Sequence, residues 1–265
     1  MKRILTALLL IPLVVCLVLW GPAYLLAAVV LAIAELGMWE FFRLAEGTGA
    51  HAVRVPGYAF AGAFALLSLT DSISAWVLAG GILFLMVLCG WEMLSRREPA
   101  GFLAAVSSTF LGVFYVAVPL SLLVWVGLRP GGRWAVLFAL VAVWMGDSAA
   151  FFVGRAWGRH KLSPHISPGK TWEGSAASLT AAVLVGLVFA RFFWKGLAYP
   201  EAALLAVVIN IAAQIGDLAE SALKRSAGVK DSSQLVPGHG GVLDRIDALL
   251  FAAPVLWYYW LWKAG

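Results

Sequence analysis

Charged residues are scarce in this sequence. Only 12% of its 265 residues are Asp, Glu, Lys or Arg, and 62% are hydrophobic, whereas soluble domains carry roughly 25% charged residues. This composition excludes a water-soluble fold. The two cysteines, Cys16 and Cys89, lie inside apolar runs, which gives neither a disulfide framework nor a cysteine zinc site. The net charge is +5, but the basic residues form no soluble domain or tail, so we expect no nucleic-acid partner.

Long hydrophobic runs fill most of the chain. They are about 17 to 25 residues long, which is enough for a helix to cross a hydrocarbon core of about 30 Å. Few of them show the two-residue alternation of apolar and polar residues that is typical of the strands of a membrane β-barrel. We therefore predict an all-α polytopic integral membrane protein with about nine transmembrane helices. The predicted spans are residues 4–20, 23–43, 56–70, 74–91, 102–127, 134–153, 174–191, 200–222 and 242–262.

The basic residues predict the orientation of these spans. Cytoplasmic loops are enriched in Lys and Arg, and an arrangement with the N-terminus inside and the C-terminus outside puts most of the nineteen Lys and Arg residues in the cytoplasm. It also puts the loops 154–173 and 223–241 there. If the short third span and the fourth are one helix, the N-terminus moves outside, but both loops can stay inside.

No internal repeat or linker divides the chain, so we predict a single membrane domain over residues 1–265. Within it, residues 1–140 are expected to be scaffold helices and residues 141–250 the catalytic region. Half of the fourteen Asp and Glu residues lie in or beside the two cytoplasmic loops: Asp147, Glu173, Asp217, Glu220, Asp231, Asp244 and Asp247.

Three of these carboxylates are predicted to face one another. Asp244 and Asp247 share one face of the last helix, and Asp217 with Ser221 forms a similar face on the helix before it. Like charges so placed repel unless a cation lies between them, and oxygen ligands suit Mg²⁺. The alternative is a set of structural ion pairs within or between helices.

The loop before the last helix has the residues of a phosphate site. Lys224–Arg225 and Lys230–Asp231 precede Pro237–Gly241, and glycines at a helix N-terminus expose N–H groups that bind anions. In the other loop, Lys170 is the expected phosphate contact. Its Gly-Lys-Thr context is similar to the end of a P-loop, but Pro164 stands where that motif needs glycine, so we reject a P-loop.

The segment Ser221–Asp247 closely resembles the signature of bacterial phosphatidate cytidylyltransferases, also called CDP-diacylglycerol synthases. Its letters are SALKR, four residues, KD, and then PGHGGVLDRID. Ser167–Gly174 and Gly146–Ser148 also resemble that family, so the motifs cover roughly residues 144–250. Val236 departs mildly from the pattern, where a bulkier apolar residue is expected.

The resemblance implies a reaction of CTP with phosphatidic acid, giving CDP-diacylglycerol and pyrophosphate with Mg²⁺, at the cytoplasmic face of a bacterial inner membrane. We expect Asp217, Asp244 and Asp247 to hold Mg²⁺ and Asp147 to complete a second cation position. The expected substrate contacts are Lys170, Ser221, Lys224, Arg225, Lys230, Asp231, His239, Gly240, Gly241 and Arg245. Membrane lipids surround the chain, and small-residue spacings permit a homodimer without requiring one.

Two other functions are alternatives. A CDP-alcohol phosphotransferase also joins a nucleotide and a lipid, but its Asp-Gly and Ala-Arg signature with two spaced Asp residues is absent here. An ion-coupled transporter would explain carboxylates within spans. However, transport predicts acidic residues spread across the depth of the membrane, whereas these gather toward one face.

Overall fold

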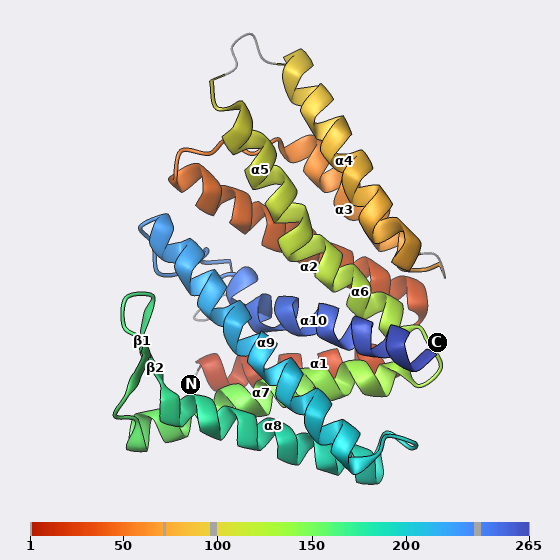
Figure 1. The fold of residues 1–265 in the computed structure, drawn as a ribbon, viewed down its shortest axis with the longest axis vertical. Coiled ribbons are helices and arrows are strands. Elements are labelled where there is room, and N and C mark those ends of the chain that lie inside the picture. Colours follow the sequence, from red (N-terminus) through yellow and green to blue (C-terminus); the bar gives the residue numbers. More distant parts are fainter. Residues whose placement is uncertain (1, 71–72, 96–99, 236–239, 265) are drawn as a thin grey trace. The chain divides into compact units, whose positions relative to one another are not determined.

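The structure is a computed structural model that describes residues 2–70, 73–95, 100–235 and 240–264 (Figure 1). Almost all of this part of the chain is helical. The helices are α1 (Lys2–Trp20), α2 (Ala23–Gly47), α3 (Arg54–Leu67), α4 (Ile73–Ser95), α5 (Phe102–Gly112), the π-helical turn η1 (Val113–Ala117), α6 (Val118–Gly127), α7 (Gly132–Trp157), α8 (Trp172–Phe192), α9 (Tyr199–Ser226) and α10 (Leu243–Ala264). Strands β1 (Lys161–Ser163) and β2 (Ser167–Thr171) form a short antiparallel hairpin.

Each predicted span coincides with a helix, with α5, η1 and α6 forming one continuous helix. In the described part of the chain, six helices are long and apolar enough to cross a membrane: α2, most of α4, α5 to α6, α7, α8 and α9. Helix α3 has 14 residues, fewer than the roughly 20 that a perpendicular span needs. It is separate from α4. The count of nine spans and the N-in orientation remain predictions.

The chain divides into two compact units. Unit 1 contains Met1–Leu13, Gly21–Trp125 and Leu223–Arg245; unit 2 contains Val14–Trp20, Val126–Ala222 and Ile246–Gly265. Each unit joins segments from the N-terminal and the C-terminal parts of the sequence. Most of the signature segment, residues 223–245, therefore belongs to the same unit as α2 to α5 and most of α6, whereas Ser221 and Asp247 belong to unit 2.

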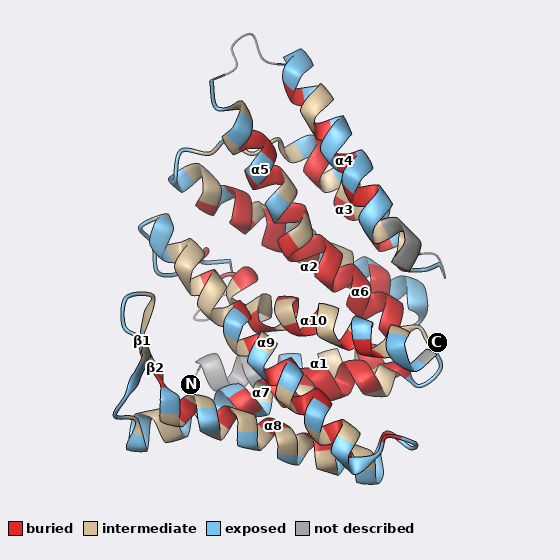
Figure 2. Ribbon diagram, viewed as in Figure 1, coloured by how far each residue is buried: buried red, intermediate tan, exposed pale blue. Residues whose placement is uncertain are grey.

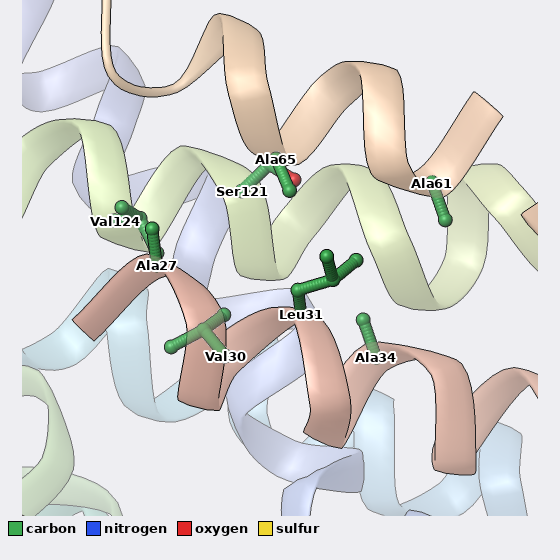
Figure 3. A pocket seen from close by; sticks show the side chains of 8 residues that line it. All are labelled: Ala27, Val30, Leu31, Ala34, Ala61, Ala65, Ser121 and Val124. Carbon is green, nitrogen blue, oxygen red and sulfur yellow. The ribbon is translucent and has the colours of Figure 1, made fainter. Parts of the chain in front are cut away.

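Small side chains bring three helices of unit 1 close together (Figure 3). The space between them has no room for a water molecule. Close approach through small residues is the usual means of packing helices in a membrane, where dispersion contacts replace the hydrophobic effect. Figure 2 shows buried residues along α2 and along α5 to α6. The side chains at the contact in Figure 3 are Ala27, Val30, Leu31 and Ala34 of α2, Ala61 and Ala65 of α3, and Ser121 and Val124 of α6.

The long fifth helix contains one π-helical turn, η1. Pro119 has no N–H to donate to the carbonyl of Tyr115, which explains why the α-helical pattern is interrupted here. Just before the turn, a side chain on Gly112 would lie 2.5 Å from the Phe42 ring. Helix α2 therefore packs against the backbone of this helix, and the Tyr115 ring lies 5.6 Å from that of Phe41.

Glycines set the helix contacts of unit 2. A Cβ on Gly146 of α7 would lie 2.6 Å from Asn210 Nδ2, and one on Gly186 of α8 would lie 2.8 Å from the Ala202 carbonyl oxygen. On α9, a Cβ at Gly216 would lie 2.6 Å from the carbonyl oxygen of Asp247 in α10. The residues next to Gly146 and Gly216 are Asp147 and Asp217, so these close contacts fix the backbone positions of two predicted site residues.

Candidate active site

The predicted loop 154–173 is built as a hairpin on the ends of α7 and α8. Lys161 pairs with Thr171, and Ser163 pairs with Ser167. Thr171 caps α8, because its Oγ1 accepts a hydrogen bond of 3.1 Å from Gly174 N. The hairpin is a small departure from the all-α prediction. It places Lys170 on a strand that leads directly into a helix.

Three predicted residues gather in unit 2, from α7, β2 and α9. Lys170 Nζ lies 2.7 Å from Asp217 Oδ2, with side-chain exposures of 24% and 35%. The Nζ atom of Lys170 is buried. Its contact with Asp217 is an ion pair without the geometry of a hydrogen bond. Asp147 interacts electrostatically with both Asp217 and Lys170. Two carboxylates and one ammonium group thus form a single charged cluster, which we call the Asp147 cluster.

A partly buried polar network joins α8 and α9, the helix that contains Asp217. Ser175 Oγ donates to Gln214 Oε1 at 2.5 Å, and Gln214 Nε2 donates to Asn210 Oδ1 at 2.7 Å. Asn210 Nδ2 then donates to Ser178 Oγ at 2.9 Å. We did not predict this network. Its signal in the sequence is the spacing of Asn210 and Gln214, which are one helical turn apart in an apolar run.

His160 also holds the hairpin in place. Its Nδ1 lies 2.7 Å from Glu173 Oε1, and its backbone N–H donates to the same carboxylate at 3.3 Å. His160 lies three residues after the end of α7, just before β1, and Glu173 is in the first turn of α8. This contact joins the two ends of the segment that contains Lys170.

The second group of predicted residues lies in unit 1. Lys224 Nζ lies 2.5 Å from Asp244 Oδ1, with side-chain exposures of 13% and 7%. Asp244 Oδ2 accepts hydrogen bonds from Gly241 N at 2.7 Å and Ser232 N at 3.1 Å. Ser232 Oγ, which has one proton to donate, lies 2.9 Å from both Asp244 Oδ2 and Glu40 Oε2. Gly240 has a φ of +81°, and a Cβ there would lie 2.7 Å from the same oxygen. Asp244 therefore organises the turn before α10.

Glu40 of α2 also belongs to this group, although from the sequence it could equally face a polar interior or pair with Arg43. Its side chain is completely buried. It accepts hydrogen bonds from Ser232 Oγ, Ser233 Oγ, Val242 N and Leu243 N, at distances from 2.5 to 2.9 Å. The signature segment is thus held by a carboxylate about 200 positions away in the sequence.

A cavity of about 260 Å³ lies in unit 1 between α2, α5 and the end of α9. Its wall includes Leu223 and Ser226, which flank Lys224 and Arg225. The remaining lining is mainly apolar, with a few hydroxyl groups: Phe41, Leu44, Ala45, Thr48, Ala50, Ala104, Ser107, Ser108 and Leu111.

The other predicted residues are more dispersed. Arg225 is exposed and donates to the Val229 carbonyl at 3.1 Å. Ser221 is partly buried on α9, and Asp247 is partly buried on α10. His239 lies outside the described residues. Three further predicted contacts are exposed: Lys230, Asp231 and Arg245.

Among the described residues, no three His, Cys, Asp or Glu side chains lie close enough together to hold a metal ion. The proposed set of Asp217, Asp244 and Asp247 therefore stays a prediction. The Asp147 cluster does fit Mg²⁺, because this ion commonly takes one or two carboxylates and completes its shell with water and substrate phosphates.

Comparisons with known proteins agree with the signature. Residues 1–262 match the model of the cytidylyltransferase family. The chain is 33% identical to a phosphatidate cytidylyltransferase of Haemophilus influenzae over 288 residues, which cover 98% of both chains. It is 34% identical to the protein of that name from Staphylococcus haemolyticus, covering 88% of this chain and 86% of the relative. The Brucella suis protein of that name is 40% identical, covering 70% of this chain and 71% of the relative.

Proposed function

Because the chain belongs to the cytidylyltransferase family, we propose that it transfers the cytidylyl group of CTP to phosphatidic acid, giving CDP-diacylglycerol and pyrophosphate. The chain is a membrane-embedded nucleotidyltransferase of phospholipid biosynthesis. The observation that carries the proposal is the pairing of Lys224 with Asp244 inside the signature segment. An ammonium group beside a carboxylate provides the two partners that a metal–nucleotide complex needs, one for phosphate and one for the cation.

The location of these groups suits one water-soluble and one lipid substrate. Lys170 lies on β2 just before α8 begins, and Lys224 lies in the last turn of α9. Each lysine is thus near the end of an apolar helix, where water-soluble CTP and a lipid head group are both accessible. The cavity beside Leu223 and Ser226 is mainly apolar, which suits the acyl chains of a lipid. We propose that the segments containing Lys170 and Lys224 both face the cytoplasm, at a bacterial inner membrane.

The lipid supplies its own nucleophile. A phosphate monoester has a second pKa near 6 and is largely dianionic at neutral pH. One of its oxygens forms a bond to the α-phosphorus of CTP, while the bond from that phosphorus to the bridging oxygen breaks and pyrophosphate leaves with the electron pair. The work of the protein is to align the two phosphates and to neutralise their charge. Lys170, Lys224, Arg225 and Lys230 would bind phosphate oxygens.

The carboxylates would hold Mg²⁺. Asp147 and Asp217 interact electrostatically in unit 2, and Asp244 and Asp247 lie near the start of α10. When bound, Mg²⁺ neutralises charge on the triphosphate and on the leaving pyrophosphate. Lys170, paired with Asp217, would then contact a phosphate next to the metal position.

The proposal is tested with the purified full-length protein in detergent, CTP and phosphatidic acid, with and without Mg²⁺. We expect CDP-diacylglycerol and pyrophosphate in equal amounts, and neither product after chelation of Mg²⁺. Diacylglycerol, which lacks the phosphate nucleophile, should give no product. Folded protein in lipid that makes no product from phosphatidic acid would contradict the proposal and favour the transporter instead.

A further inference from the structure

The Glu40 carboxylate binds both ends of one loop. On the N-terminal side of the loop it accepts from the hydroxyl groups of Ser232 and Ser233, at 2.9 and 2.5 Å. On the C-terminal side it accepts from the backbone N–H groups of Val242 and Leu243, at 2.9 and 2.6 Å. One side chain of α2 thus binds both Ser232–Ser233 and Val242–Leu243.

Burying a carboxylate is costly unless hydrogen bonds replace its water. Here four donors do so, and two of them are N–H groups at the start of α10, which have no partner within the helix. The positive end of the α10 dipole also favours an anion at this position. Glu40 therefore contributes to where α10 begins, and α10 begins one residue before Asp244.

Ser232 connects Glu40 to the Lys224–Asp244 pair. Its hydroxyl oxygen lies 2.9 Å from Glu40 Oε2 and 2.9 Å from Asp244 Oδ2. There is no room for a side chain at Gly241, because a Cβ there would lie 2.0 Å from Ser232 Oγ and 2.5 Å from both Glu40 oxygens. Any displacement of Glu40 must therefore move groups that touch Asp244.

We propose that Glu40 is a positioning residue, whose buried carboxylate sets the geometry of the Lys224–Asp244 pair through Ser232 and the N-terminus of α10. This inference rests on the proposed function for its effect on catalysis. Its structural part, that Glu40 fixes the loop, does not depend on the reaction. Glu40 acts through other residues and is not expected to touch either substrate.

Glu40→Gln is the test variant, because it keeps the size of the side chain and removes acceptors. Whichever way the amide lies, its NH₂ group faces one backbone N–H and one serine hydroxyl that now donate to the carboxylate. The matched control is Glu35→Gln, the same change on the same helix. Glu35 is partly exposed, in contrast to the buried Glu40.

The first measurement is the kinetics of the purified full-length variants, expressed per folded molecule. We expect Glu40→Gln to lower kcat about tenfold to a hundredfold, as small misplacements of reacting groups do, with a smaller change in KM for CTP. Glu35→Gln should stay within about twofold of wild type. Ser232→Ala should lower kcat less than Glu40→Gln does. The double variant should have nearly the same kcat as Glu40→Gln alone, because both residues act through the same chain of contacts. An unchanged kcat per folded molecule in Glu40→Gln would overturn the proposal. So would a double variant in which the effects of Glu40→Gln and Ser232→Ala on kcat are fully additive.

Hydrogen exchange separates this inference from the proposed function. In Glu40→Gln, amides of residues 230–235 and 240–245 should exchange at least about tenfold faster than in wild type, since their closing contacts are lost. The same amides in Glu35→Gln should be unchanged. If wild-type protein makes no CDP-diacylglycerol, the proposed function fails, and the exchange data still decide whether Glu40 holds the loop. Unchanged exchange in Glu40→Gln would overturn that role whatever the activity.

Discussion

Lys170 and Lys224 each lie against an aspartate, at 2.7 and 2.5 Å. Such pairs could be purely structural, since a charge inside a membrane protein normally has a partner. The two roles differ in what a substitution changes. A structural pair affects the free energy of unfolding, whereas a substrate-binding pair affects kcat/KM in molecules that remain folded.

Lys170→Met tests this difference in unit 2. We expect kcat/KM for CTP to fall at least about tenfold, because a cation that contacts a charged phosphate typically contributes 1.5 to 3 kcal/mol. Lys161→Met is the matched control on the same hairpin, where Lys161 is exposed. The measurement is steady-state kinetics in detergent beside a thermal unfolding curve. Loss of stability with an unchanged kcat/KM per folded molecule would make Lys170 a structural residue only.

Gly241→Ala tests how tightly the signature turn is packed. The added Cβ would fall 2.0 Å from Ser232 Oγ, so we expect destabilisation of about 1 to 3 kcal/mol, as for other overpacked sites. Gly62→Ala is the control, because a Cβ on Gly62 of α3 meets nothing within 4 Å. Both are compared by thermal unfolding in the same detergent. Equal melting temperatures for wild type and Gly241→Ala would show that the turn is looser than the structure indicates.

At the scale of helices and strands, hydropathy predicted where the helices are but not where they end. Helices α2, α7 and α9 continue to Gly47, Trp157 and Ser226, about one turn beyond the predicted spans. Hydrophobicity marks the part of a helix that lies in lipid, whereas backbone hydrogen bonds continue into the polar region. Lys224 and Arg225, expected in a loop, are therefore in the last turn of α9.

The contacts of the site were predictable only in part. Residue types and motif spacing predicted Lys170, Asp217, Lys224 and Asp244 as candidate site residues, but not which lysine pairs with which aspartate. That choice depends on the hairpin and on how helices far apart in the sequence pack. Glu40 shows the limit most clearly, because its partner Ser232 is 192 residues away and nothing in the local sequence of α2 indicates the contact.

The polar network between α8 and α9 gives a prediction at this scale. Ser178→Ala should destabilise the protein by about 0.6 kcal/mol, the average for interhelical hydrogen bonds in membranes, and by no more than about 1.7 kcal/mol, because it removes the acceptor of Asn210 Nδ2. Thr180→Ala on the same helix is the control, since its hydroxyl donates to the Ala176 carbonyl of its own helix. Unfolding by a denaturing detergent gives both values. Equal losses for the two variants would mean that the network contributes nothing beyond local effects.

At the scale of the whole molecule, the orientation in the membrane is still a prediction from basic residues. It can be tested by single cysteines at Lys161 and Lys230, in a chain where Cys16 and Cys89 are replaced by serine. We expect a membrane-impermeant thiol reagent to leave both positions unmodified in intact cells with permeable outer membranes, and to modify them after the inner membrane is opened. Labelling of either position in intact cells would place that loop outside.

The most direct test of the central claim is the initial rate of CDP-diacylglycerol formation as Mg²⁺ is varied, for wild type beside Asp217→Asn and Asp244→Asn. We predict a rate that rises with Mg²⁺ and saturates in wild type, and a loss of about a hundredfold or more in both variants, since each removes charge from a predicted metal or phosphate contact. The account would be contradicted if folded wild-type protein formed no product, or if both variants kept the wild-type rate and Mg²⁺ dependence.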